Sequence, residues 1–253
     1  MGDIIETSVT LDNGRIISCR YVKGNEPCVV FMHGTLSDKN ASKSLFLQNY
    51  CLQHNQAFCS FDFTGHGASS GKYTDATIGI WLQDALGVLD KVVLEKALLV
   101  GSSMGGWIMF LAALLRPEKV VGCLGIAAAP DFTRDVWDSF SEEQKKEVLS
   151  KGVIYTPNGW TEQGDPWTYA LFEDGKKYLM LDKKVDVFCP VVLLHGDKDD
   201  CVPVQTSLKM KDALMAEDVK VVIMKNGTHR FSSPAELDLV KDSLRYLMKK
   251  LNV

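Results

Sequence analysis

The chain has 253 residues, of which 46% are hydrophobic, and its 28 basic and 32 acidic residues give a formal net charge of −4. This length and apolar content allow one large buried core, so we expect a single domain over residues 1–253. The charges are interspersed along the chain rather than gathered into a basic surface, which argues against a nucleic-acid partner.

No segment of the sequence predicts a membrane span. The first residues, MGDIIE, lack a basic region followed by an apolar one, and no apolar run approaches the roughly 18 residues that a span needs. The seven cysteines form no C-x-x-C pair and lie mostly in apolar runs, as is typical of buried thiols in a reducing compartment. We therefore expect a cytoplasmic protein, or one of the mitochondrial matrix if a leader is absent from this sequence.

The predicted elements indicate an α/β fold. Two alternating segments, residues 4–11 and 15–22, flank the turn Asp12-Asn13-Gly14 and predict an antiparallel hairpin. Apolar runs then predict strands buried on both faces, at residues 28–32, 57–61, 97–100, 120–126, 188–194 and 219–224. Segments of helical composition lie between most of them, at residues 41–53, 77–93, 104–115, 205–215 and 235–251. This alternation predicts a mostly parallel central sheet with helices on both faces.

Residues 131–187 interrupt the alternation. They are rich in charged and aromatic side chains, with a predicted helix at residues 142–150 and turn signals at 157–159 and 164–166. We interpret the segment as a short lid insertion over the carboxyl edge of the sheet, where ligands bind in open α/β folds.

The pentapeptide Gly101-Ser102-Ser103-Met104-Gly105 follows one predicted strand and precedes a predicted helix. In that setting a G-x-S-x-G sequence forms a nucleophile elbow, which exposes the central serine beyond the strand end. The flanking glycines suit a turn that needs unusual backbone angles and close approach of the helix to the strand. Ser103 is therefore the predicted catalytic nucleophile.

A serine nucleophile needs a base, and five histidines are available. His33, His66 and His195 each precede glycine near a strand end or turn, which favours a structural role, and His54 follows a helix end. His229 lies between the last predicted strand and the last predicted helix, on a loop that reaches the same sheet edge as Ser103. We expect His229 to be the general base.

The carboxylate that orients this base is predicted to be Asp199. It lies in the loop His195-Gly196-Asp197-Lys198-Asp199-Asp200, at the position from which related loops direct a carboxylate towards the histidine. Asp197 and Asp131 remain alternatives, with Asp199 then capping the following turn. The loop lacks the glycine and terminal glutamate of a calcium loop, so no metal site is predicted. The order Ser, Asp, His is that of α/β-hydrolases.

Attack on a carbonyl also requires two fixed backbone N–H donors for the oxyanion. Met104, directly after the nucleophile, is predicted to supply one donor. The other is expected from the loop after the third strand, with Thr35 preferred and Leu36 as the alternative. Four residues are expected to line an apolar substrate pocket, or instead to form the lid's own core: Leu36, Tyr155, Trp160 and Trp167.

Together with the elbow, four segments carry a family resemblance: His33-Gly34, the run FDFTGHGASSG at residues 61–71, the loop of Asp199 and the loop of His229. The chain resembles α/β-hydrolase-fold serine hydrolases over nearly its whole length. Residues 101–107, 116–120 and 125–129 further resemble a small esterase group that includes a mitochondrial depalmitoylating thioesterase, which also cleaves acyl glucuronides, and bacterial relatives. The chain lacks the basic, serine-rich leader of the mitochondrial members.

The resemblance implies hydrolysis of a small-molecule or acyl-protein ester or thioester, through a Ser103 acyl-enzyme and without a cofactor, by a monomer or homodimer. Two alternatives remain open. The same triad would serve a serine peptidase or a carbon–carbon bond hydrolase, and a hydrolase fold can also bind a ligand without turning it over.

Overall fold

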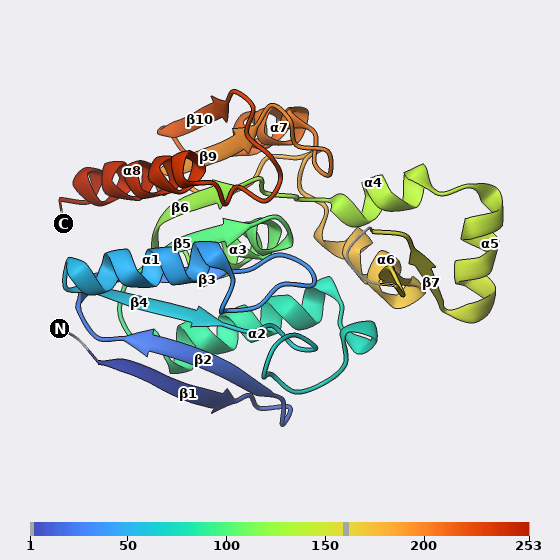
Figure 1. Ribbon diagram of the computed structural model, residues 1–253, viewed down its shortest axis with the longest axis horizontal. Helices are drawn as coiled ribbons and strands as arrows, with labels where there is room; N and C mark the ends of the chain where they lie inside the picture. Colours follow the sequence, from blue (N-terminus) through green and yellow to red (C-terminus); the bar gives the residue numbers. More distant parts are fainter. Residues whose placement is uncertain (1–2, 159–161, 253) are drawn as a thin grey trace.

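An eight-stranded sheet organises the computed structural model, which describes residues 3–158 and 162–252 (Figure 1). In order across the sheet, the strands are β1 (Ile4–Thr10), β2 (Ile16–Val22), β4 (Gln56–Phe61), β3 (Asn25–Met32), β5 (Ala97–Ser102), β6 (Val120–Ile126), β9 (Val191–Gly196) and β10 (Val219–Met224). β2 pairs antiparallel with both β1 and β4. From β4 to β10 in this order across the sheet, each pair of neighbouring strands is parallel. The predicted hairpin and mostly parallel sheet are confirmed.

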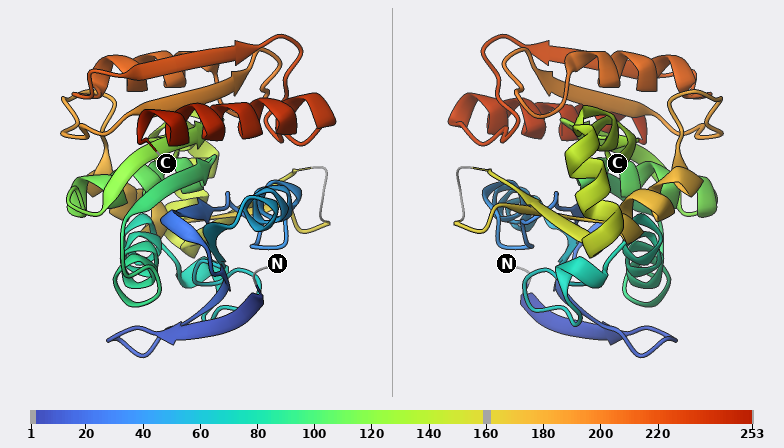
Figure 2. Two further views of the ribbon diagram at one scale, coloured as in Figure 1. Left: turned by 90° about the vertical axis from the view of Figure 1, so that its left-hand side faces the viewer. Right: turned by 90° about the vertical axis from the view of Figure 1, so that its right-hand side faces the viewer.

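Helices cover both faces of this sheet because side chains alternate along the buried strands. Val29 and Phe31 of β3 face a cluster that includes α1 (Ser42–Gln53) and α8 (Pro234–Lys250). Val30 and Met32 face the opposite cluster, which includes α2 (Ile78–Lys91), α3 (Met104–Leu115) and α7 (Val204–Ala213). Figures 1 and 2 show the resulting three layers. No helix among the described residues is both long and apolar enough to cross a bilayer.

Two strand predictions need correction. Residues 219–224 do form β10, but this strand is not buried on both faces, because it is the last strand of the sheet and has a neighbour on one side only. Its Ile223 is 47% exposed. Residues 188–190 precede β9 rather than belonging to it, and Phe188 is 66% exposed.

Between β6 and β9 the chain leaves the sheet and forms elements of its own: α4 (Phe132–Ser139), α5 (Glu142–Lys151), β7 (Val153–Thr156), β8 (Asp165–Thr168) and α6 (Tyr169–Gly175). Short 3₁₀ turns lie at Tyr73–Asp75 and Lys176–Tyr178. Figure 1 shows α4, α5 and β7 beyond one end of the sheet strands. Helix α5 begins with a capping box of Ser141 and Gln144, close to its predicted position. The sequence analysis did not predict α4, α6 or the β7–β8 hairpin.

Candidate active site

Ser103 lies on a strained turn between β5 and α3. Its φ of 53° is in the positive region that residues with side chains rarely adopt, at a cost on the order of 1–3 kcal/mol. Hydrogen bonds tie its backbone to the end of β6: its N–H donates to the Ile126 carbonyl at 3.0 Å, and its own carbonyl accepts from Ala129 N at 3.0 Å. These contacts hold the serine beyond the strand end, as the elbow sequence predicts.

The flanking glycines provide close approach rather than unusual backbone angles. A Cβ on Gly101 would stand 2.5 Å from the Gly105 carbonyl oxygen, and one on Gly105 would stand 2.2 Å from the Met32 carbonyl oxygen. Neither glycine has a positive φ; Ser103 itself has the strained angle. Side chains at the two glycines would therefore push α3 away from β3 and β5.

Three segments far apart in sequence bring a serine, a histidine and an aspartate together. The hydroxyl of Ser103 lies 3.1 Å from Nε2 of His229. On the other side of the ring, Nδ1 lies 2.9 Å from a carboxylate oxygen of Asp199. A neutral imidazole that donates from Nδ1 to the carboxylate has its Nε2 lone pair directed at the serine hydroxyl, which is the arrangement a general base requires.

Both carboxylate oxygens of Asp199 have polar partners. One accepts the backbone N–H groups of Cys201 and Val202 at 2.9 and 2.8 Å. The other faces His229 and also His195 Nε2, which lies 3.2 Å away. Burial opposes ionisation of this carboxyl, but the hydrogen bonds from His195 and His229 outweigh it and lower the pKa of Asp199 well below its usual value. Asp199 is therefore a fixed anion beside the imidazole.

His195 is the member of this network that sequence reasoning missed. In line with the structural role expected for it, His195 contacts the Val202 carbonyl oxygen at 2.8 Å and Ser207 Oγ at 2.7 Å. Its contact with Asp199 adds a positioning role. The sequence signal was the spacing of four residues between His195 and Asp199 across the end of β9.

The loops of Asp199 and His229 are tied to each other. Asp197, one of the alternative carboxylates, accepts the backbone N–H of Asn226 at 2.6 Å, and Lys198 N donates to the Gly227 carbonyl at 2.9 Å. Glu236 of α8 accepts Thr228 N at 2.8 Å, immediately before His229. Asp197 therefore joins the two loops and has no recorded contact with the imidazole.

Asp131, the other alternative carboxylate, has a different set of partners. Its buried side chain accepts the backbone N–H groups of Met180 and Leu181 at 2.8 and 3.0 Å, and it pairs with Arg134 at 3.3 Å. These contacts join the start of α4 to the chain that follows α6. Its carboxylate anchors both ends of the insertion.

The loop after β3 lies against the elbow, where the sequence predicts the second oxyanion donor. A Cβ on Gly34 would stand 3.7 Å from Ser103 Oγ. The N–H of Leu36 is already used, because it donates to His66 Nε2 at 3.2 Å. For Thr35 N–H the described residues supply no recorded acceptor. Met104 is the first residue of α3, where backbone N–H groups have no partner within the helix.

Two further histidines, His33 and His66, contact the loop after β3. His33 contacts the Gly34 carbonyl oxygen through Nδ1 and accepts Phe63 N through Nε2, and burial lowers its pKa to about 4. Burial, together with the neighbouring His33, lowers the pKa of His66 to about 4. Both rings are neutral at pH 7 and support backbone, in line with the structural roles expected for them.

The residues expected to line a pocket lie in different surroundings. Leu36 and Tyr155 are 49% and 41% exposed. Trp167 stacks on Phe172 at 6.1 Å and donates to Thr156 Oγ1 at 2.8 Å, so it packs within the insertion. Trp160 lies outside the described residues.

A cavity of about 220 Å³ lies between the insertion and α7, beside the site. Two of its lining residues are bonded to the triad: Ala129 N donates to the Ser103 carbonyl, and Cys201 N donates to the Asp199 carboxylate. Its apolar lining is Ala129, Pro130, Phe132, Val136, Leu181, Val202 and Pro203. Its polar lining is Arg134, Asp135, Cys201, Gln205, Thr206 and Lys209.

Comparisons with known proteins show which family this chain resembles. The model of the alpha/beta hydrolase family matches residues 29–238. The mitochondrial palmitoyl-protein thioesterase ABHD10 of cattle is 35% identical over 237 residues, which cover 93% of this chain and 78% of the relative. The human protein of the same name is also 35% identical over 237 residues, with the same coverage.

Two solved structures share the fold over almost their full length. Mouse alpha/beta hydrolase domain-containing protein 10 has a TM-score of 0.91 at 34% identity, and the match covers 98% of this chain and 99% of that one. A putative hydrolase from Agrobacterium vitis has a TM-score of 0.92 at 31% identity, with the same coverage. The elbow, the fold and these matches together show that the chain belongs to the alpha/beta hydrolase family.

Proposed function

We propose that this chain is a serine esterase or thioesterase whose catalytic triad is Ser103, His229 and Asp199. The observation that carries the proposal is the continuous hydrogen-bonded path from Ser103 Oγ through the His229 ring to Asp199, at 3.1 and 2.9 Å. A serine hydroxyl is a weak nucleophile at neutral pH, and a base at this distance removes its proton as attack proceeds.

The reaction proceeds in two halves. Ser103 Oγ attacks the acyl carbon while His229 Nε2 takes its proton, and Asp199 stabilises the imidazolium that forms. The N–H groups of Met104 and Thr35 hold the oxyanion, and His229 returns the proton to the departing alcohol or thiol. Water, deprotonated by the same ring, then attacks the acyl-enzyme and releases the acid. Every proton passes through His229, so no cofactor is needed.

We propose an acyl thioester or ester as the substrate. The relatives named palmitoyl-protein thioesterase favour a fatty acyl group, carried by a protein or a small molecule. The cavity beside Cys201 is about 220 Å³, below the roughly 300–1,000 Å³ usual for ligand pockets. We propose that this cavity takes the acyl group and that residues 131–187 move to enlarge it for a palmitoyl chain, which is the lid role proposed for them. The half-exposed side chains of Leu36 and Tyr155 would line the route that this movement opens.

For location, we propose the mitochondrial matrix, the alternative that the sequence analysis kept open. The similar mammalian thioesterases are named as mitochondrial proteins, and they give no support to the expected cytoplasmic location. All seven cysteines are free thiols, which suits either reducing compartment. Subcellular fractionation of the endogenous protein tests this proposal.

One panel tests the activity. Acyl thioesters, nitrophenyl esters and amino-acid amides of matched acyl group, each from two to sixteen carbons, are compared by kcat/KM. We expect thioesters and esters to be cleaved and amides to be poor substrates. Dominant amide cleavage would favour the peptidase alternative. Tight binding without turnover of any substrate would favour a ligand-binding protein.

A further inference from the structure

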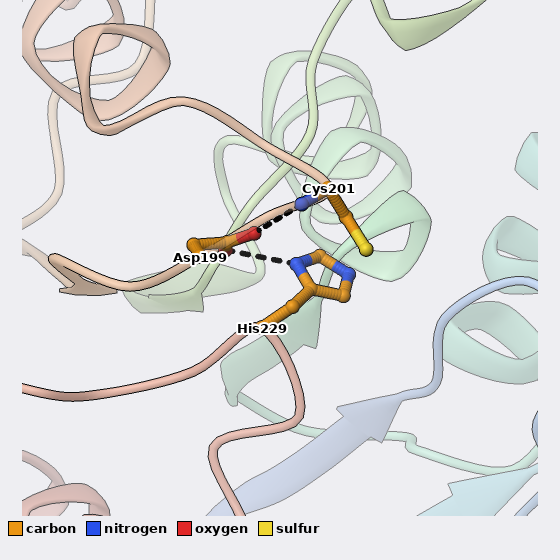
Figure 3. A group of neighbouring side chains, drawn as sticks. All are labelled: Asp199, Cys201 and His229. Carbon is orange, nitrogen blue, oxygen red and sulfur yellow. Dashed lines mark hydrogen bonds and ion pairs between the residues drawn. The ribbon is translucent and has the colours of Figure 1, made fainter.

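A thiol lies beside the proposed triad and has no part in the mechanism. Cys201 follows Asp199 by two residues on the loop after β9, and its side chain is exposed. Figure 3 shows Cys201, Asp199 and His229 pointing towards a shared space from the loops that follow β9 and β10. One ligand atom from each of the three residues lies within 4.8 Å of the other two.

Sulfur, imidazole nitrogen and carboxylate oxygen are the three ligand types that zinc uses in proteins. Zinc–ligand distances are about 2.0–2.3 Å, so in a tetrahedral site two ligand atoms lie roughly 3.3–3.8 Å apart. The three ligand atoms here lie within 4.8 Å of one another, so they must approach by up to about 1.5 Å to share one ion. Because Cys201 is exposed and its thiol makes only a 3.4 Å contact with Asp200, rotation about its Cα–Cβ bond can bring the sulfur closer.

The rest of the loop is already built to hold these ligands. Asp199 is fixed by two backbone N–H groups, and the loop of His229 is fixed by contacts to Lys198 and Glu236. Asp199 and the loop of His229 are therefore already held in place, so binding an ion would require no further ordering of their loops. The sequence predicts the pairing of Asp199 with His229, but not that the Cys201 side chain joins them.

We propose that Asp199, Cys201 and His229 bind one Zn²⁺ ion, and that the bound ion inhibits hydrolysis reversibly. Coordination releases the thiol proton to solvent, leaves the imidazole proton on the ring nitrogen that does not bind zinc, and forms a sulfur–zinc bond, with water in the remaining position and no change of oxidation state. The inhibition follows from the proposed function, because an imidazole held by zinc no longer accepts the proton of Ser103. The binding itself does not depend on that function.

Binding is measured first, without activity, on the full chain carrying Ser103→Ala. Competition with a chromophoric zinc chelator should give one high-affinity ion per chain, and adding Cys201→Ser should weaken it by about ten-fold or more. Cobalt(II) in place of zinc should give a sulfur-to-cobalt charge-transfer band that Cys201→Ser removes. The matched control is Cys189→Ser, because Cys189 is a half-buried thiol 3.8 Å from Cys123 and outside this cluster.

Inhibition is measured next, with each variant compared with its own zinc-free rate. Wild-type activity should fall with added zinc and return on addition of EDTA, and Cys201→Ser should need about ten-fold more zinc for half-inhibition. Equal zinc affinity in Cys201→Ser and its parent would overturn the proposal, as would loss of binding in Cys189→Ser. Cys201-dependent binding in a chain that hydrolyses no ester would support the metal site and refute the proposed function.

Discussion

The carboxyl edge of the sheet and the insertion at residues 131–187 are built in different ways. At the sheet edge, backbone and side-chain hydrogen bonds fix the proposed triad, and Asp199 accepts three of them and also lies 3.2 Å from His195 Nε2. The insertion is held mainly by a small apolar cluster of Phe140, Val148, Ile154 and Phe172. Directional bonds hold atoms in place for chemistry, whereas a small core can loosen locally at low cost. We therefore propose that the reaction takes place at the edge and that the insertion determines substrate choice.

The largest effect should come from breaking the serine–histidine pair. We expect Ser103→Ala, His229→Ala and the double variant each to lower kcat by a factor on the order of 10⁶, because the residues act as a unit. Steady-state kinetics on a short nitrophenyl ester measures this, and circular dichroism checks that each variant is folded. A double variant much slower than either single variant would show that the two residues act independently.

The next effect concerns the carboxylate. Asp199→Asn should lower kcat by about 10⁴, because an amide cannot stabilise the imidazolium and favours the wrong tautomer of His229. Asp197→Asn is the matched control on the same loop, and we expect a much smaller loss from it. A comparable loss in both variants would mean that the loop, rather than the charge of Asp199, determines the rate.

A smaller and more selective effect is expected from the insertion. Phe172→Ala removes a side chain that is 2% exposed and stacks on Trp167, which should loosen the apolar cluster. The ratio of kcat/KM between long and short acyl substrates should change several-fold, while kcat on an acetyl ester changes little. Leu149→Ala, at a position in α5 that is 56% exposed, provides the control. Equal losses at every acyl length would contradict the division between edge and insertion.

The smallest effect concerns stability, and it tests the buried histidines His33 and His66 beside the proposed site. Burial lowers the pKa values of His33 and His66 to about 4, against about 6.5 in an unfolded chain. Between these values the unfolded chain binds more protons, so the free energy of unfolding should fall as pH drops from about 6.5 to 4. His66→Gln should reduce the slope by about one proton, as measured by urea unfolding at several pH values. An unchanged slope would show that His66 is protonated in the folded protein.

The difference between the two regions also explains what the sequence could predict. Long periodic segments and the elbow around Ser103 gave the sheet, its helices and the order of the proposed triad, because those signals are local and strong. The choice of Asp199 over Asp197 and Asp131 rested on loop position, and their separate hydrogen bonds became visible only in three dimensions.

The insertion was harder to predict for a physical reason. Its strands β7 and β8 have four residues each, too few for a period-two pattern to stand out, and α4 has eight. The contact of His195 with Asp199 and the use of Leu36 N–H by His66 were missed because both depend on loop geometry. The edge exposure of β10 depends on strand order, which no local pattern encodes.

The most direct test of the central claim is to map where a fluorophosphonate reacts with the native protein. Mass spectrometry of the digested adduct should find the phosphonyl group on Ser103, in the peptide that contains GSSMGG, and Ser103→Ala should remain unlabelled. His229→Ala should be labelled far more slowly, because the hydroxyl then lacks its base. Labelling of the native chain at another residue, or equal labelling of the native chain and Ser103→Ala, would contradict the account.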